Sequence, residues 1–476
     1  MPDTTMTTGT RNGAVFERLN PMTRAVATVS HAASAADARA ACDAAAAAFD
    51  AWAALGPNER RTLLLRCADA LAARSDDFAR LMLSECGMTA GWAGFNAYLA
   101  AGIMREAACL TTQVRGEVVP ADKPGTFAIA IRQPAGVVVG IAPWNAPVIL
   151  GVRAIAAPLA CGNTVVLKAS ESSPGVHALI VEILAEILPP GVVNLVTNAP
   201  ADAAEIVETL IAHPAVRRVN FTGSTHVGRI VATLCAKYLK PSLLELGGKA
   251  PLIVLDDADL DAAVNATVFG AFMNQGQICM ATEKVVVDAS VADEFVRRLA
   301  ARASVLPAGD PTGHVVLGSM IGEDAATRVE AQITDALAKG ATAPARGGRN
   351  GTVLGATVLD GVTPAMRLYT EESFGPVVVV VRVNGVDEAV AAANDTEYGL
   401  SASVFGRDVR RAMDVARRIQ SGICHVNGPT VADEAQMPFG GVKASGWGRF
   451  GGTAVINEFT DLRWITIEDP QQHYPF

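Results

Sequence analysis

Four short runs of largely β-branched residues decide the fold class: VVVGI at 137–141, TVVLK at 164–168, VVNLV at 192–196 and RRVNF at 217–221. Segments of helical length, such as 174–188 and 201–211, lie between them. Short apolar strands that alternate with helices are typical of a parallel sheet with helical crossovers. This stretch therefore predicts a doubly wound α/β unit.

A second series of strand-like runs follows: LIVL at 252–255, KVVV at 284–287, PVVVVV at 376–381 and SASVF at 401–405. The series predicts a second doubly wound unit, with a junction near 245–251. Two further segments alternate as antiparallel strands outside this rhythm, TFAIAIRQ at 126–133 and FTDLRWITIE at 459–468. We expect these two to be edge strands that pair with each other or with another chain.

The N-terminal hundred residues are helical by composition, with alanine-rich periodic segments at 35–55 and 59–86, and no strand is expected among them. The largely apolar segment 137–162 is long enough to span a bilayer. Pro143, Pro147 and Arg153 lie within it, so it predicts a buried strand, a turn and a helix instead.

Composition excludes several classes of protein. The chain has 476 residues, of which 50% are hydrophobic and 18% charged, against about 25% charged in an ordinary domain. A disordered chain would show the opposite balance. The net charge of −9, with no basic stripe, excludes a nucleic-acid-binding protein.

Eight cysteines are too few and too dispersed for a disulfide scaffold. No C-x-x-C or H-x-x-x-H pair indicates a metal site, and residues 1–12 contain no secretory signal. We therefore expect a cytoplasmic protein with reduced thiols and no metal.

Glycine-rich segments suggest one phosphate site and one decoy. Residues 446–451 spell G-x-G-x-x-G, but no strand precedes them and too little chain follows to complete a dinucleotide-binding unit. GSTHVG at 223–228 fits better, because it follows a predicted strand and opens a helical segment, and amides at a helix N-terminus attract phosphate. GGKA at 247–250 lacks P-loop spacing, and no G-x-S-x-G indicates a serine hydrolase.

Three residues in separate segments are candidates for catalysis. Cys279 lies in FMNQGQICMAT, where Gly276 permits a tight turn. A lone cysteine is most often a buried small hydrophobe. Glu245 in LLELGGKAP and Asn145 in APWNAP both lie where a strand passes into a loop, the place where site residues collect in doubly wound folds.

These segments resemble the aldehyde dehydrogenase superfamily over nearly the whole chain. The matching blocks occur in family order: PWNAP, TVVLKASE, FTGST, LELGGKAP, NQGQICMA, EESFGPV, HVNGPT and PFGGVKASGWGR. Variants such as PWNAPVIL, GQICM and DEAQMPFGG are most similar to the branch that oxidises aromatic aldehydes, first vanillin and then salicylaldehyde or benzaldehyde.

The resemblance implies an α/β fold with two doubly wound parallel-sheet domains and a small β arm for oligomerisation. Residues 1–115 and 135–246 would form the cofactor-binding domain and 247–447 the catalytic domain. Residues 116–134 and 458–476 would form the arm, which implies a homodimer or homotetramer.

The resemblance also implies roles for the three candidates. Cys279 as thiolate would attack the aldehyde carbon. The Asn145 amide and the Cys279 backbone N–H would stabilise the oxyanion. Glu245 would activate the water that releases the carboxylic acid. Relatives that transfer the acyl group to coenzyme A lack this carboxylate, so Glu245 favours hydrolysis.

The implied cofactor is NAD rather than NADP. Lys168 and Glu171 match the positions that hold the adenosine ribose, where an acidic group binds the 2′-hydroxyl and repels a 2′-phosphate. Ser224 and the amides around Gly223 match the pyrophosphate contact. The full cofactor set is Ile141, Pro143, Trp144, Lys168, Ser170, Glu171, Phe221, Gly223, Ser224, Val227, Leu246, Gly247, Glu372 and Phe374.

An aromatic substrate is implied by the same resemblance. Ala146, where many relatives carry a large aromatic residue, would open space beside Asn145. The candidates that would line a pocket for a flat ring are Trp92, Tyr98, Arg153, Ile278 and Trp447. Arg153 would pair with a substrate oxygen or with a neighbouring carboxylate. Oxidation of an aliphatic aldehyde or semialdehyde, and a non-catalytic protein of the same fold, are the alternatives.

Overall fold

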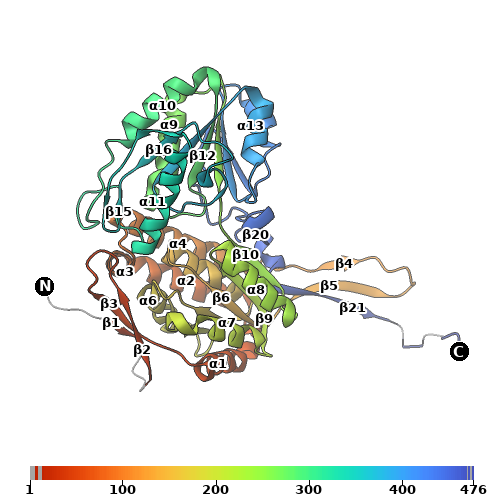
Figure 1. Ribbon diagram of the computed structural model, residues 1–476. Coiled ribbons are helices and arrows are strands. Elements are labelled where there is room, and N and C mark those ends of the chain that lie inside the picture. Colours follow the sequence, from red (N-terminus) through yellow and green to blue (C-terminus); the bar gives the residue numbers. More distant parts are fainter. Residues whose placement is uncertain (1–5, 9–12, 469, 472–473) are drawn as a thin grey trace.

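The computed structural model describes residues 6–8, 13–468, 470–471 and 474–476. Two large sheets with their helices form two stacked α/β units, and a thin sheet projects to one side (Figure 1). The prediction of two largely parallel units is confirmed.

The first unit is built on a six-stranded sheet in the order β20-β10-β9-β6-β7-β8. Its strands are β6 (Val137–Ile141), β7 (Thr164–Lys168), β8 (Val193–Val196), β9 (Val216–Thr222), β10 (Ser242–Glu245) and β20 (Gly446–Trp447). All neighbours are parallel except β20, which runs antiparallel to β10. The G-x-G-x-x-G decoy therefore begins as an edge strand of this sheet.

The helices of the first unit pack around this sheet. They are α1 (Ala35–Ala54), α2 (Pro57–Ala73), α3 (Ser75–Cys86), α4 (Ala90–Leu110), α5 (Pro147–Ala160), α6 (Pro174–Ala185), α7 (Ala203–Ala212) and α8 (Thr225–Lys237). Both β6 and α5 are buried along their whole length, as the strand, turn and helix prediction for 137–162 requires. None of the helices in the described part of the chain is long and apolar enough to cross a bilayer.

The second unit contains a seven-stranded sheet in the order β13-β16-β17-β12-β11-β18-β19. Its strands are β11 (Ala250–Val254), β12 (Thr282–Asp288), β13 (Thr342–Ala345), β16 (Thr357–Asp360), β17 (Val377–Val383), β18 (Ser401–Phe405) and β19 (Ile423–Val426). The accompanying helices are α9 (Leu260–Phe272), α10 (Ala289–Ala303), α11 (Glu323–Ala338), α12 (Arg367–Thr370), α13 (Gly385–Asn394) and α14 (Val409–Ala416). A two-stranded ribbon, β14 (Arg349–Asn350) with β15 (Val353–Leu354), completes the unit.

The absence of strands in the N-terminal hundred residues is a wrong prediction. β1 (Met6–Thr8), β2 (Val15–Leu19) and β3 (Val26–His31) form a small three-stranded sheet. This sheet is tied to the first unit, because Thr197 donates a hydrogen bond to the backbone oxygen of His31. Such a long-range contact leaves no trace in the local sequence pattern.

The projecting sheet consists of β4 (Glu117–Val119), β5 (Phe127–Pro134) and β21 (Thr460–Ile467) (Figure 1). β21 pairs antiparallel with β5 along its full length, so the two edge-strand segments pair with each other. Trp464 and Ile467 are exposed on it. The homodimer or homotetramer, and the domain boundaries near 115, 135 and 246, stay predictions.

Candidate active site

Cys279 lies in a loop that enters β12, the central strand of the second sheet. The turn before it (Met273–Gly276) places three successive residues in the left-handed region, Asn274 (φ 49°), Gln275 (φ 57°) and Gly276 (φ 70°). Such backbone costs about 1–3 kcal/mol for each non-glycine residue and persists only where other contacts enforce it.

Two glutamine side chains provide those contacts. The Gln275 amide donates to the Ser319 oxygen and accepts from the Gly318 N–H, each at 3.0 Å. Gln277 accepts from the Ile321 N–H at 2.9 Å. Both side chains are fully buried. The loop that presents Cys279 is therefore held rigidly against residues 318–321.

Asn145 lies in the loop between β6 and α5 of the first unit, just before that helix begins. Its Nδ2 donates to the Gln277 oxygen at 3.1 Å, so one of its two N–H bonds joins the Cys279 loop. The Asn145 backbone oxygen accepts from Trp92 Nε1 and Asn274 Nδ2, each at 3.0 Å. Together these bonds bring Asn145 and Cys279, which are far apart in the sequence, into one site between the two units.

Glu245 ends β10 and is 2% exposed. Neither carboxyl oxygen makes a well-formed hydrogen bond with the described residues, although the Gly441 N–H lies near enough to lower the pKa. Burial raises the pKa of Glu245 well above its usual range, and Arg153 and Arg449 offset only part of this effect. The site therefore favours the neutral acid.

Burial is also the main cause of the raised pKa values of Cys279 and Glu372. It raises the pKa of the Cys279 thiol to about 12, and the carboxylates of Glu245 and Glu372 add to the effect. It raises the pKa of Glu372 to about 7, with a further contribution from Glu283. A positive charge or a proton acceptor near Cys279 would be needed to form the thiolate at neutral pH.

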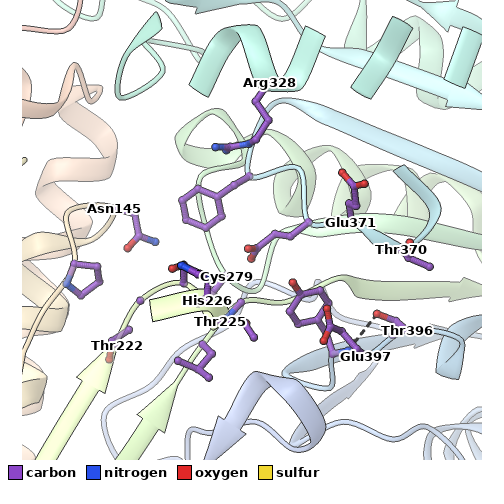
Figure 2. A pocket seen from close by; sticks show the side chains of 18 of the residues that line it. Asn145, Thr222, Thr225, His226, Cys279, Arg328, Thr370, Glu371, Thr396 and Glu397 are labelled. Carbon is purple, nitrogen blue, oxygen red and sulfur yellow. Dashed lines mark hydrogen bonds between the residues drawn. The ribbon is translucent and has the colours of Figure 1, made fainter. Parts of the chain in front are cut away.

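Two cavities meet at Cys279. The larger cavity has a volume of about 810 Å³ and the second, which we call the aromatic cavity, about 380 Å³. Asn145, Leu150 and Cys279 line both. In Figure 2, Asn145, Thr222 and His226 approach the larger cavity from the first unit, and Arg328 and Glu371 approach it from the second.

The larger cavity collects most of the residues predicted to bind the cofactor. These are Pro143, Trp144, Gly223, Ser224, Leu246, Gly247, Glu372 and Phe374. Ser224 caps α8, since its hydroxyl accepts from the Val227 N–H, so the amides at the start of this helix face the cavity wall. A Cβ on Gly247 would lie 2.8 Å from a Glu372 carboxylate oxygen, so a side chain at this position would require Glu372 to shift.

The remaining predicted cofactor residues do not line that cavity. Ile141 and Phe221 are buried in β6 and β9, and Val227 is exposed on α8. Lys168, Ser170 and Glu171 lie at and just after the carboxyl end of β7. The Lys168 ammonium contacts the Glu171 carboxylate, which also accepts from Asn198 Nδ2 at 2.9 Å.

The donor set suits a dinucleotide. A capped helix N-terminus attracts a pyrophosphate, a carboxylate at the end of β7 can accept from a ribose hydroxyl, and a cavity of this volume has room for a large ligand. These groups would hold NAD or NADP across the ends of β7 and β9. Among the described residues no cluster of three or more His, Cys, Asp or Glu side chains could hold a metal ion.

The aromatic cavity contains three of the five predicted substrate residues, Trp92, Arg153 and Ile278. Tyr98 and Trp447 line neither cavity: Tyr98 is 76% exposed on α4, and Trp447 donates from Nε1 to the Ser242 oxygen at 2.8 Å. Arg153 pairs with a neighbouring carboxylate, Asp433, which is one of the two partners considered for it.

Sequence reasoning missed several residues of this cavity. They are Phe95, Ile149, Phe269, Met273, Met280, Val431, Asp433 and Phe439. Phe95 lies three residues after Trp92 on α4, a helical spacing that could have revealed it. Asp433 and Phe439 come from an irregular loop, for which the sequence offers no periodic signal.

A rigidly held cysteine and a side-chain amide lie where a dinucleotide-sized cavity meets an apolar one, an arrangement typical of dehydrogenases that use a nicotinamide cofactor. The model of the aldehyde dehydrogenase family matches residues 8–465. The chain belongs to this family, whose members are oxidoreductases that act on aldehydes and use NAD(P).

Individual relatives are similar over almost their whole length. Vanillin dehydrogenase of Pseudomonas fluorescens is 62% identical over 98% of this chain and 97% of its own. Benzaldehyde dehydrogenase [NAD(+)] of Pseudomonas putida is 37% identical over 98% and 95%. The crystal structure of a salicylaldehyde dehydrogenase from Pseudomonas putida G7, complexed with salicylaldehyde, superimposes with a TM-score of 0.96, 50% identity, and 97% and 96% coverage.

Proposed function

We propose that this enzyme oxidises an aromatic aldehyde, vanillin or a closely related hydroxy- or methoxybenzaldehyde, to the carboxylic acid with NAD. The observation that carries the proposal is the aromatic cavity that ends at Cys279. Trp92, Phe95, Phe269 and Phe439 line it, and side chains of this kind bind a flat ring. The relatives named for vanillin, salicylaldehyde and benzaldehyde support the same substrate class.

Cys279 and Asn145 would have different roles at the aldehyde carbon. Cys279 forms the bond to that carbon, and the carbonyl oxygen becomes an oxyanion. The second N–H of the Asn145 amide and the backbone N–H of Cys279 would stabilise it, since the Cys279 N–H donates none of the hydrogen bonds found among the described residues. NAD, when bound, accepts the hydride.

Glu245 suits the hydrolytic half of the reaction. Release of the acid requires water to attack the thioester on Cys279, and a base must take a proton from that water. Among the charged groups, Glu245 contributes most to the raised pKa of Cys279, which supports this assignment. Burial raises the pKa of Glu245, and a higher pKa makes its carboxylate a stronger base toward water.

NAD rather than NADP is supported by the Glu171 carboxylate. Lys168 and Asn198 hold this carboxylate in place at the end of β7, where it would oppose a 2′-phosphate. An oligomer assembled through the projecting sheet is part of the same proposal, because exposed Trp464, Leu462 and Ile467 leave an apolar edge uncovered.

The test is NADH formation by the purified enzyme with NAD and a panel of substituted benzaldehydes and aliphatic aldehydes. We expect the highest kcat/KM for hydroxy- and methoxybenzaldehydes, and no turnover by the Cys279→Ala variant. Higher kcat/KM for an aliphatic semialdehyde would contradict the aromatic assignment. Absence of NADH with every aldehyde would favour a non-catalytic protein.

A further inference from the structure

A buried ion pair forms part of the wall of the aromatic cavity. Nη2 of Arg153, on α5, lies 2.9 Å from Oδ1 and 2.6 Å from Oδ2 of Asp433. The side chains are 6% and 9% exposed. The Arg153 guanidinium also lies 4.5 Å from the centre of the Phe439 ring, a cation–π contact that fixes its plane.

Most of the other lining residues are apolar, among them Trp92, Phe95 and Phe269, and the polar ones are Asn145, Cys279 and Glu434. A ring hydroxyl that enters such a cavity gives up its hydrogen bonds to water and needs a partner inside. Asp433 is the buried carboxylate available there. Glu434, the next residue, is exposed and its carboxylate already accepts from Gln436.

The geometry leaves Asp433 free to accept. A carboxylate offers about four lone-pair positions, and Arg153 uses two of them. Asp433 also acts on the reacting centre, since it raises the pKa of Cys279 while Arg153 lowers it. Cys279, Arg153 and Asp433 line the same cavity, so a ring whose aldehyde carbon lies at Cys279 shares that cavity with the ion pair.

We propose that Asp433 accepts a hydrogen bond from a hydroxyl group on the substrate ring, and that Arg153 is the positioning residue that orients its carboxylate. The inference rests on the proposed oxidation of aromatic aldehydes and specifies the preferred class, phenolic benzaldehydes. A hydrogen bond to a charged acceptor is stronger than one between neutral groups. A methoxy group cannot donate one.

The first test uses the unaltered enzyme. Hydroxybenzaldehydes with the hydroxyl group at ring position 2, 3 or 4 are compared with the methoxybenzaldehydes of the same position, and kcat/KM is measured for each. We expect the hydroxyl form to be preferred about tenfold or more at one position at least. Equal values at all three positions would overturn the inference, without the need for any variant.

Asp433→Asn supplies the second test, with Glu434→Gln as the matched change one residue along the chain. We expect Asp433→Asn to reduce the hydroxyl-to-methoxy ratio to near one, while kcat/KM for unsubstituted benzaldehyde falls less. Arg153→Lys keeps the positive charge, so it should retain more of the preference in kcat/KM for hydroxy- over methoxybenzaldehyde than Arg153→Met does. A merely structural role would lower kcat/KM equally for all substrates.

The outcomes separate this inference from the proposed function. If the enzyme oxidises benzaldehydes but Asp433→Asn keeps the full ratio, or only Glu434→Gln loses it, the role of Asp433 is refuted and the proposed function stands. If the unaltered enzyme oxidises no aromatic aldehyde, both are refuted.

Discussion

Replacement of Glu283 by glutamine should destabilise the enzyme and weaken its hold on the cofactor. Glu283, on β12, lies 2.6 Å from the Lys249 ammonium, and the two side chains are 3% and 1% exposed. Its carboxylate also accepts from the backbone N–H of Ser373 at 2.8 Å and of Phe374 at 2.9 Å. One buried carboxylate thus neutralises a buried cation and holds the loop that presents Glu372 and Phe374.

The expected loss of stability is about 3–5 kcal/mol, the usual consequence of leaving one partner of a buried ion pair without the other. Glutamine has only one side-chain oxygen, which can accept a hydrogen bond from one of the two backbone N–H groups. The other N–H group is left without its partner, and this adds a further loss of stability of up to about 1–3 kcal/mol. The loop position matters as well, because Phe374 has a φ of 50°, which the contacts of its own N–H stabilise. We therefore expect KM for NAD to rise more than KM for the aldehyde.

Stability can be measured by urea unfolding followed by circular dichroism, and cofactor affinity by titration with NADH. The double variant Lys249→Met/Glu283→Met should lose less than the sum of its single variants, because no unpaired charge remains. Asp414→Asn breaks an ion pair whose partners are 65% and 73% exposed, and should change little. A Glu283→Gln enzyme that unfolds at the same urea concentration as the unaltered one would refute this reasoning.

Three further predictions concern the site itself. Glu245→Gln should release a burst of NADH and then turn over about a hundredfold or more slowly, as acyl-enzyme accumulates; an unchanged steady-state rate would contradict its role as base. Iodoacetamide reacts with the thiolate, and burial raises the pKa of Cys279 to about 12, so modification of Cys279 in the cofactor-free enzyme should become about tenfold faster per pH unit from pH 7 to 10; a rate that levels off within this range would contradict a raised pKa. Glu171→Gln should reduce the preference in kcat/KM for NAD over NADP about tenfold, and an unchanged ratio would remove the carboxylate from cofactor selection.

The parallel strands and the arm could be predicted from the sequence because their signals are local. Five or more successive residues of β6, β7 or β17 are enough to show a buried strand, and alternation in β5 and β21 shows an edge strand. β2 and β3 were not predicted from the sequence, because their short alternating runs precede long alanine-rich helices. Contacts with residues far along the chain stabilise these strands.

The residues of the candidate site also differ in whether a local sequence pattern reveals them. Cys279, Glu245 and Asn145 lie in segments with recognisable sequence blocks, and the structure places all three near one another. Asp433 and Phe439 lie in an irregular loop, and only the fold brings them against Arg153. A side chain whose role depends on a partner far away in the sequence cannot be recognised from the local pattern of a single sequence.

The location of the site between the two units has a consequence for catalysis. Asn145 belongs to the first unit and Cys279 to the second, so the two proposed oxyanion donors come from both units. The bond from Asn145 Nδ2 to the Gln277 oxygen and that from Asn274 Nδ2 to the Asn145 oxygen join the two loops directly. Misplacement of a reacting group by about 1 Å can cost about a hundredfold in rate. We therefore expect the buried glutamines that fix the Cys279 loop to contribute to the rate through geometry, although neither of them lines the two cavities.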